Sequence, residues 1–190
     1  MAQEIEIEFK NLLTKNEFEK LTQAYQLDNE DFVLQENHYF DTKSFALKHK
    51  GAALRIRKKN GRYVLTLKEP AAVGLLETHQ ALTEVPEFEK FIVPAGPVQD
   101  QLAHLEVDCG AIRYFGSLTT NRAEKESEKG LIVLDHSRYL NKEDFELEFE
   151  AADWDEGKLA FEKLLQQFSI PQRETKNKIF RFYEQKRKSL

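Results

Sequence analysis

EIEIEFK, residues 4–10, alternates charged and apolar side chains along its whole length. In a β-strand successive side chains point to opposite faces, so the three glutamates and Lys10 share one face and the three apolar residues share the other. The pattern returns in DFELEFE, residues 144–150, which again carries glutamates at spacing two. Strands of this kind predict a sheet that buries only its apolar side against a core.

Runs with period-two alternation occur eight times, each bounded by turn signals. They cover approximately residues 3–10, 35–42, 51–59, 62–69, 74–82, 112–126, 131–137 and 144–152. Helical patterns follow the capping box Thr14-Lys15-Asn16-Glu17 and lie at about 83–106, interrupted by prolines, 155–168 and 175–186. Eight mostly antiparallel strands form a sandwich or a closed barrel. At 190 residues, the chain is expected to form one α+β domain, residues 1–190.

A tight turn decides which basic residues share a strand face. Asn60-Gly61 is a two-residue hairpin signal, and it predicts that Arg55 lies opposite Thr66. One face of this hairpin then carries the bases Arg55, Arg57, Lys59, Arg62 and Lys68. The two bases that flank the turn, Lys59 and Arg62, are interpreted as solvated surface residues.

Acids and bases are sorted onto different strands. On a solvated surface, residues of both signs would be mixed. Carboxylates two apart on a strand are roughly 7 Å from each other, and at an effective dielectric near 20 each such pair repels by about 2.4 kcal/mol. A second hairpin, at residues 127–130, places Arg122 opposite Asp135. Inside a closed barrel, acids favour a hard cation such as Mg²⁺ or Mn²⁺, and bases favour a polyanion. We therefore predict an antiparallel barrel with a polar, charged lumen and helices packed outside.

Several short motifs run in a fixed order along nearly the whole chain, beginning with the E-x-E-x-K of residues 6–10. The later ones are Tyr39-Phe40-Asp41-Thr42, Leu54-Arg55-Ile56-Arg57, Thr66-Leu67-Lys68, Arg122, Leu134-Asp135, Glu148-Phe149-Glu150 and Lys176-x-Lys178. This ordered set resembles the CYTH superfamily of triphosphate tunnel metalloenzymes. The superfamily includes class IV adenylate cyclases and thiamine, inorganic and RNA triphosphatases.

The resemblance implies an eight-stranded tunnel that cleaves between phosphates by metal-assisted attack of water. It implies that one or two Mg²⁺ or Mn²⁺ ions are held by Glu6, Glu8, Asp135, Glu148 and Glu150. It also implies that phosphate oxygens are bound by Lys10, Arg55, Arg57, Lys68, Arg122, and Lys176 or Lys178. Glu4 and Glu146 extend the two acidic ladders, and we expect them to support the metal ligands or to lie at the tunnel mouth. No residue is identified as the general base.

Three functions fit this pattern. The first is a metal-dependent hydrolase of a small triphosphate, either inorganic tripolyphosphate or an organic triphosphate. The second is a class IV adenylate cyclase, and the third is a non-catalytic module that binds metal-polyphosphate or a nucleotide triphosphate. We favour the hydrolase because both acidic ladders are complete and no adenine pocket is identified. Since neighbouring glutamates repel, replacing Glu8 or Glu148 is expected to abolish turnover with stability unchanged or raised.

Composition limits the partners. Thirty-three acidic residues against 28 basic ones give a net charge of −5, which argues against a nucleic-acid partner. No apolar run approaches the roughly 20 residues that a membrane-spanning helix needs, so neither a membrane anchor nor a secretion signal is expected. A single cysteine, Cys109, fits a reducing compartment. We expect a cytoplasmic protein whose partner is a small triphosphate, and the sequence says nothing about its oligomeric state.

Overall fold

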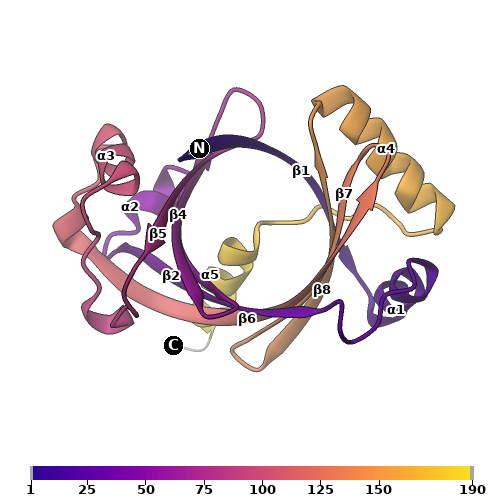
Figure 1. Ribbon diagram of the computed structural model, residues 1–190, viewed down its shortest axis with the longest axis horizontal. Helices are drawn as coiled ribbons and strands as arrows, with labels where there is room; N and C mark the ends of the chain where they lie inside the picture. The colour runs from indigo at the N-terminus through magenta and orange to yellow at the C-terminus, as the bar shows by residue number, and fades with distance from the viewer. Residues whose placement is uncertain (1, 189–190) are drawn as a thin grey trace. The chain divides into compact units, whose positions relative to one another are not determined.

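The computed structural model describes residues 2–188 (Figure 1). Its strands are β1 (Gln3–Leu13), β2 (Val33–Thr42), β3 (Ala53–Lys59), β4 (Arg62–Pro70), β5 (Leu75–Leu82), β6 (Ile112–Ser127), β7 (Gly130–Tyr139) and β8 (Lys142–Ala151). Its α-helices are α1 (Lys15–Ala24), α2 (Ala46–His49), α3 (Pro97–His104), α4 (Trp154–Gln167) and α5 (Lys178–Lys188). Two 3₁₀ turns, η1 (Phe88–Lys90) and η2 (Cys109–Ala111), lie before and after α3.

The strands follow the order β1-β5-β4-β3-β2-β6-β7-β8, and the sheet closes into a barrel. The neighbouring strands whose registers are determined pair in antiparallel fashion. The prediction of an α+β fold built on an eight-stranded antiparallel barrel is therefore confirmed. Closure pairs both sides of each strand, so the sheet has no exposed edge.

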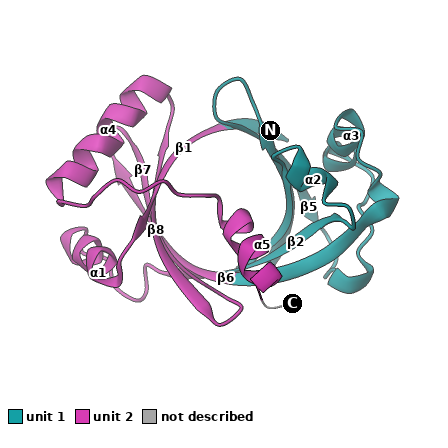
Figure 2. Ribbon diagram, turned by 180° about the vertical axis from the view of Figure 1, so that it is seen from behind, with its two compact units in different colours: residues 1–5, 35–118 teal, residues 6–34, 119–190 magenta. Residues whose placement is uncertain are grey.

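The chain divides into two compact units, coloured separately in Figure 2. Unit 1 contains residues 35–118 together with the start of β1 up to Ile5. Unit 2 contains Glu6–Leu34 and everything from Thr119 onward. Each unit has a hydrophobic core of its own, between its strands and its helices.

In unit 1, the apolar face of β3 and β4 packs against helices. Leu54, Ile56, Leu65 and Leu67 are fully buried in one cluster. The cluster also contains Leu47 of α2 and Val98 and Leu102 of α3. The register places Arg55 opposite Thr66 and Lys68 opposite Ala53, as the Asn60-Gly61 turn predicts. The apolar face thus takes the helices and leaves the basic face on the other side of the sheet.

Unit 2 repeats this arrangement with β7 and β8. Leu134, Leu147 and Phe149 pack with Leu21 of α1 and Phe161 of α4. The second hairpin has the predicted register, with Arg122 opposite Asp135. Because side chains alternate along a strand, the glutamates of β8 point away from this core.

The predicted helical region at 83–106 is only partly correct. Helix occurs there as η1 and as α3, and the residues between these two elements have no helical structure. α3 begins at Pro97, the position in a helix where proline is best tolerated. The pattern also missed α2, a four-residue helix preceded by Phe45 in a left-handed conformation with a φ of 57°.

The sequence predicts that the last helix begins at about residue 175. In the structure it begins at Lys178. Residues 170–177 have no regular secondary structure. This later start decides which side chains of the tail face the strands of unit 2, as described below.

The predicted capping box is present at the start of α1. The Thr14 hydroxyl accepts a hydrogen bond from the Glu17 amide, and the Glu17 carboxylate accepts one from the Thr14 amide at 2.7 Å.

We expect Thr14→Ala to lower the free energy of unfolding by about 1 kcal/mol in urea denaturation, because the Glu17 amide loses its acceptor. Asn16→Ala, at an exposed position of the same turn, is the control and should cost less. Equal losses in both variants would argue that the cap contributes nothing.

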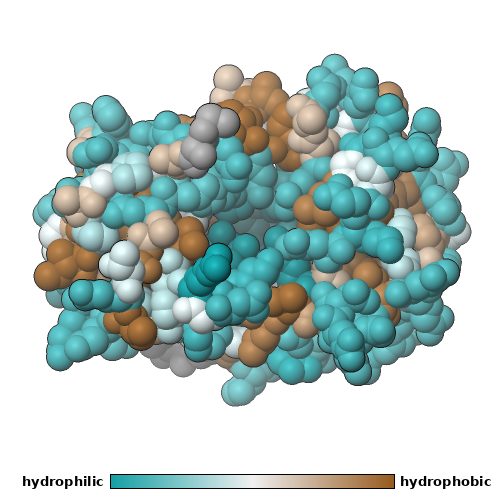
Figure 3. All heavy atoms as spheres, in the orientation of Figure 1, coloured by the Kyte–Doolittle hydropathy of each residue, from teal (hydrophilic) through white to brown (hydrophobic). Residues whose placement is uncertain are grey.

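Hydrophilic residues cover most of the face of the molecule seen in Figure 3, and apolar residues form scattered patches on it. Among residues 2–188, none of the helices is both long enough and apolar enough to cross a membrane.

Candidate active site

Four adjacent strands of unit 2 bring its acidic and basic side chains to one face. In the β1·β8 register, Glu8 lies opposite Glu150 and Lys10 opposite Glu148. In the β7·β8 register, Asp135 lies opposite Glu146. β6 adds Arg122 beside Asp135. Along each strand these residues alternate with the apolar core residues, so they point to the opposite face of the sheet. The alternation seen in EIEIEFK therefore continues across the four strands.

Arg122 is the centre of a buried ion-pair network. Its Nε donates to Asp135 Oδ1 at 2.8 Å, and its Nη2 donates to Asp135 Oδ2 at 2.6 Å. The same Nη2 reaches Glu148 Oε2 at 2.6 Å. A bidentate guanidinium–carboxylate pair has a fixed geometry, so Arg122 is held in one orientation.

Lys178, the first residue of α5, completes the network. Its Nζ lies 2.8 Å from Asp135 Oδ2 and 2.8 Å from Glu146 Oε1, and it also contacts Glu148. Burial disfavours a charge on Glu148, but Lys178 and Arg122 outweigh burial and hold the pKa of this carboxyl well below its usual range. Burial likewise opposes the charge on Lys178, yet the three carboxylates raise its pKa well above its usual value. All members are therefore charged at neutral pH except Glu146, whose pKa lies close to neutrality.

The pKa of Glu146 is raised to about 7, mainly by burial and, although Lys178 opposes the shift, by Glu148. Its carboxylate lies between two bases, since Arg181 of α5 contacts its second oxygen. Arg181 Nε also donates to Asp144 at 3.0 Å, and Tyr139 donates to the same carboxylate. Sequence reasoning missed the roles of Arg181, Asp144 and Tyr139. The available signal was the i, i+3 spacing of Lys178 and Arg181, which places both on one side of a helix.

A separate acidic group lies on β1 and β8. Glu6, Glu8 and Glu150 each offer a carboxylate oxygen, and these atoms lie within 4.8 Å of one another. Burial, and next the charge of Glu6, raise the pKa of Glu150 to about 7. Crowded carboxylates of this kind fit a hard divalent cation, which prefers oxygen ligands and removes their mutual repulsion.

The structure thus divides the five predicted metal ligands into two sets. Glu6, Glu8 and Glu150 bring carboxylate oxygens within 4.8 Å of one another, whereas Asp135 and Glu148 share their oxygens with Arg122 and Lys178.

The predicted phosphate-binding lysines of unit 2 differ in placement. Lys10 contacts Glu8; burial opposes its charge, but Glu8, Glu148 and Glu146 raise its pKa. Of the two tail lysines, Lys178 is in the network, and Lys176 is exposed and pairs with Glu184 at 2.5 Å.

A strap of residues 171–177 holds Lys178 in place. The buried side chain of Asn11 donates to Pro171 O at 3.1 Å and accepts from the Arg173 amide at 2.6 Å. Arg173 pairs with both carboxylate oxygens of Glu17 at 2.9 Å and donates to Leu12 O at 2.8 Å. The strap therefore ties the start of α5 to the end of β1 and to the capping box of α1.

We expect Arg173→Met to loosen the strap, because three hydrogen bonds, two of them to a carboxylate, are lost. Backbone amides of α5 near Lys178 should exchange with deuterium about tenfold faster or more. Arg187→Met, which removes an exposed arginine from the same helix, is the control and should leave that exchange unchanged. Equal exchange in both variants would contradict the role given to Arg173.

In unit 1, the predicted basic residues share one face of β3 and β4. Arg57 Nε donates to the buried Asn37 side chain at 3.0 Å, and Lys68 contacts Glu77, its cross-strand neighbour on β5. Arg55 Nε is buried and, among residues 2–188, has no hydrogen-bond partner. A buried donor without a partner is costly, so a ligand that accepts from it would be favoured.

Glu4, which the sequence predicts to support the ligands or lie at the tunnel mouth, belongs to unit 1 and is largely exposed. Its carboxylate lies 3.0 Å from His79 Nε2, and His79 Nδ1 lies 3.0 Å from the Thr66 hydroxyl. Glu77 lies 3.4 Å from the same imidazole nitrogen. Glu4 therefore contacts His79 of its own unit.

The sequence places this architecture in a known family. A model of the CYTH domain matches residues 4–183, so the chain belongs to the CYTH family, and the predicted family is confirmed. The chain is 75% identical, over all 190 residues of both proteins, to "Putative triphosphatase YjbK" of Bacillus subtilis. CYTH triphosphatases are generally metal-dependent, which agrees with the predicted need for a cation.

Solved structures agree with the fold. The crystal structure of a "putative adenylate cyclase" from Bacillus halodurans is 42% identical and superposes with a TM-score of 0.90, covering 96% of this chain and 100% of that one. HpAC1 from Hippeastrum, a "putative adenylyl cyclase" with a dominant triphosphatase activity, is 24% identical with a TM-score of 0.73, covering 95% and 96%. This second likeness shows the fold alone.

Proposed function

We propose that this protein is a metal-dependent hydrolase of a small triphosphate, and that residues 1–190 act as one CYTH domain. The observation that carries the proposal is that one strand face of unit 2 carries both a crowded carboxylate group and the buried cations Arg122 and Lys178, held in an ion-pair network. The first suits a divalent ion and the second suits phosphate oxygens. The triphosphatase name of the relative that is 75% identical supports the same activity.

Glu6, Glu8 and Glu150 are proposed to hold Mg²⁺ or Mn²⁺. A bound divalent cation would supply neutralisation of phosphate charge and a more acidic water molecule. Asp135 and Glu148 keep Arg122 and Lys178 charged and oriented. We propose that these two carboxylates also bind the metal ion, as a second role. The raised pKa of Glu150 means that the carboxyl must lose a proton before its oxygens can act as ligands.

We propose Arg122, Lys178 and Lys10 as the phosphate-binding residues of unit 2. Arg55, Arg57 and Lys68 are the proposed phosphate-binding residues of unit 1. An ammonium group has three donors and a guanidinium group five, so these bases can bind phosphate oxygens in addition to the side chains that they already contact. Arg55 Nε, a buried donor without a partner among residues 2–188, supports this assignment. Lys176 pairs with Glu184 at the surface and is left out of the proposed set.

The decisive assay offers the protein tripolyphosphate, thiamine triphosphate and ATP with Mg²⁺ or Mn²⁺, and separates phosphate, pyrophosphate and cyclic AMP. Phosphate release from a triphosphate, abolished by a chelator, is expected. Cyclic AMP with pyrophosphate would instead establish the cyclase alternative, and binding without any product would establish the non-catalytic module. Full hydrolysis in excess chelator would refute the proposed metal dependence.

We expect Lys68→Ala to weaken turnover of tripolyphosphate by about 10- to 100-fold, corresponding to loss of a hydrogen bond to a charged group. Calorimetric Mn²⁺ affinity without substrate should stay the same, because lysine is not a metal ligand. Lys43→Ala, an exposed lysine of unit 1, is the matched control. Kinetics in Lys68→Ala equal to those of the control would remove Lys68 from the phosphate site.

A further inference from the structure

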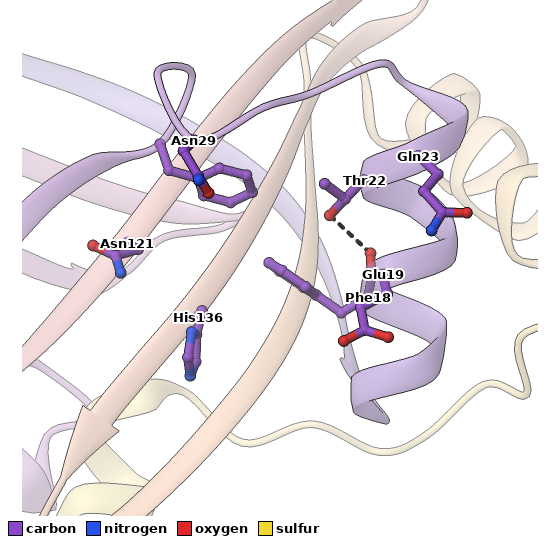
Figure 4. A pocket seen from close by; sticks show the side chains of 8 residues that line it. Phe18, Glu19, Thr22, Gln23, Asn29, Asn121 and His136 are labelled. Atoms are coloured by element: carbon purple, nitrogen blue, oxygen red, sulfur yellow. Dashed lines mark hydrogen bonds between the residues drawn. The ribbon is translucent and has the colours of Figure 1, made fainter.

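Unit 2 contains a pocket that the proposed hydrolase does not use. It has a volume of about 390 Å³ and lies between α1, the loop that follows it, and the strands β6 and β7 (Figure 4). Ligand pockets in proteins commonly begin at about 300 Å³, so this one has room for a small organic molecule. The lining residues are Phe18, Glu19, Thr22, Gln23, Asn29, Phe32, Asn121 and His136.

The pocket lies on the back of the strands that carry the ion-pair network. Asn121 and His136 form a directly opposed cross-strand pair, and each precedes or follows a residue of the network in the chain, Arg122 or Asp135. Since successive side chains of a strand point to opposite faces, Asn121 and His136 point away from the network. A ligand here would therefore be separate from the triphosphate site.

Aromatic rings form the walls. The ring of Phe18 lies 5.9 Å from that of Phe32 and 6.4 Å from the imidazole of His136. His136 is held in turn, because its ring stacks on Phe145 at 4.4 Å and its Nε2 lies 2.8 Å from Glu143. Rings fixed in this way offer flat apolar surface, which favours a planar ligand.

Three side-chain amides that line the pocket can form hydrogen bonds with a ligand. Within residues 2–188, the side chains of Gln23, Asn29 and Asn121 make no hydrogen bond to the protein, and Figure 4 shows them spaced around the pocket. The Thr22 hydroxyl, by contrast, already donates to Phe18 O at 2.9 Å. Amides both donate and accept, so they suit a ring whose edge carries nitrogen or carbonyl groups.

The surrounding charge is negative. Glu19 lines the pocket, and the loop that carries Asn29 also carries Asp28, Glu30 and Asp31, all exposed. These carboxylates disfavour a phosphorylated or otherwise anionic ligand and favour a neutral or cationic one. We propose that this pocket is a second binding site, for a planar nitrogen heterocycle that is neutral or positively charged.

The test uses three probes that share one ring and differ in charge: nicotinamide, 1-methylnicotinamide and nicotinate. Each is titrated into the full-length protein at millimolar concentration while NMR follows the side-chain amide signals of Gln23 and Asn121. The neutral and cationic probes should shift these signals, and the anion should bind about tenfold more weakly or not at all. If no probe shifts them, or if nicotinate binds as well as the others, the proposal is wrong.

Variants then locate the site. Gln23→Leu, at an exposed position of α1, should weaken binding of nicotinamide several-fold, whereas Gln166→Leu, an exposed glutamine of α4, should bind as the unaltered protein does. Asn121→Leu keeps the branched shape of the side chain and removes its hydrogen-bonding groups, so it should weaken binding about tenfold. Unchanged affinity in both Gln23→Leu and Asn121→Leu would overturn the assignment of this pocket. Hydrolysis of tripolyphosphate by Gln23→Leu serves as a check that the protein is folded.

Discussion

Glu148→Gln should lower the free energy of unfolding by about 3 kcal/mol, because it removes a buried carboxylate from between two cations. Glu148 Oε2 lies 2.6 Å from Arg122, its other oxygen contacts Lys178, and only 3% of the residue is exposed. Turnover of a triphosphate should fall by about 10- to 100-fold, since both bases lose part of their orientation. Urea denaturation in excess EDTA measures the first effect and steady-state kinetics the second.

Glu8→Gln is the matched comparison. Glu8 contacts Lys10, but it also lies within 4.8 Å of Glu6 and Glu150, so a lost ion pair is offset by relief of repulsion. Its stability should change by less than about 1 kcal/mol, while metal affinity falls about 100-fold. Equal stability of the two variants would refute the unequal roles given to these glutamates.

These two predictions differ from the expectation, based on like-charge repulsion alone, that both replacements leave stability unchanged or raised. We expect that reasoning to apply to Glu8, which has acids as near neighbours besides Lys10. We do not expect it to apply to Glu148, whose near neighbours are mainly bases. Acids two apart along a strand repel each other. The partners on neighbouring strands and on the helix determine whether replacing such an acid raises or lowers the stability of the protein.

Lys178→Met should destabilise the protein by about 3 to 5 kcal/mol at neutral pH, because three buried carboxylates lose a shared ammonium. Asp135 and Glu148 retain Arg122, and Glu146 retains Arg181. Substrate affinity should also fall, since Lys178 is one of the proposed phosphate-binding groups. Lys176→Met, two residues earlier and exposed, is the control and should change neither property by much.

The size of this loss should depend on pH. Glu146 already has a pKa of about 7, and removing Lys178 raises the pKa of its carboxyl further. An acid whose pKa is raised by folding destabilises the folded state as pH rises through its unfolded pKa, because the folded state then resists ionisation. The stability difference between Lys178→Met and the unaltered protein should thus be larger at pH 8 than at pH 5, measured in EDTA. A difference that grows as pH falls would contradict the proposed network.

Much of the fold could be predicted because its signals are local. Period-two alternation separates the two faces of each strand, and it identified all eight strands with errors only at their ends. The Asn60-Gly61 turn determined a register, since a two-residue turn permits one pairing of the strands it joins. The secondary structure of residues 83–106 was harder to predict. This segment contains three prolines and has a mixed apolar pattern, so its local sequence favours helix and loop about equally.

The sequence by itself determined which residues share a face of each strand, and therefore that acids and bases are gathered into a polar surface opposite the core. Only the tertiary structure decided which acid pairs with which base. Lys178 rather than Lys176 enters the network because α5 begins at Lys178, and that start follows a strap held by Asn11, more than 150 residues earlier in the chain. A helix turns by about 100° per residue, so where it begins and how it is anchored determine which side chains it presents.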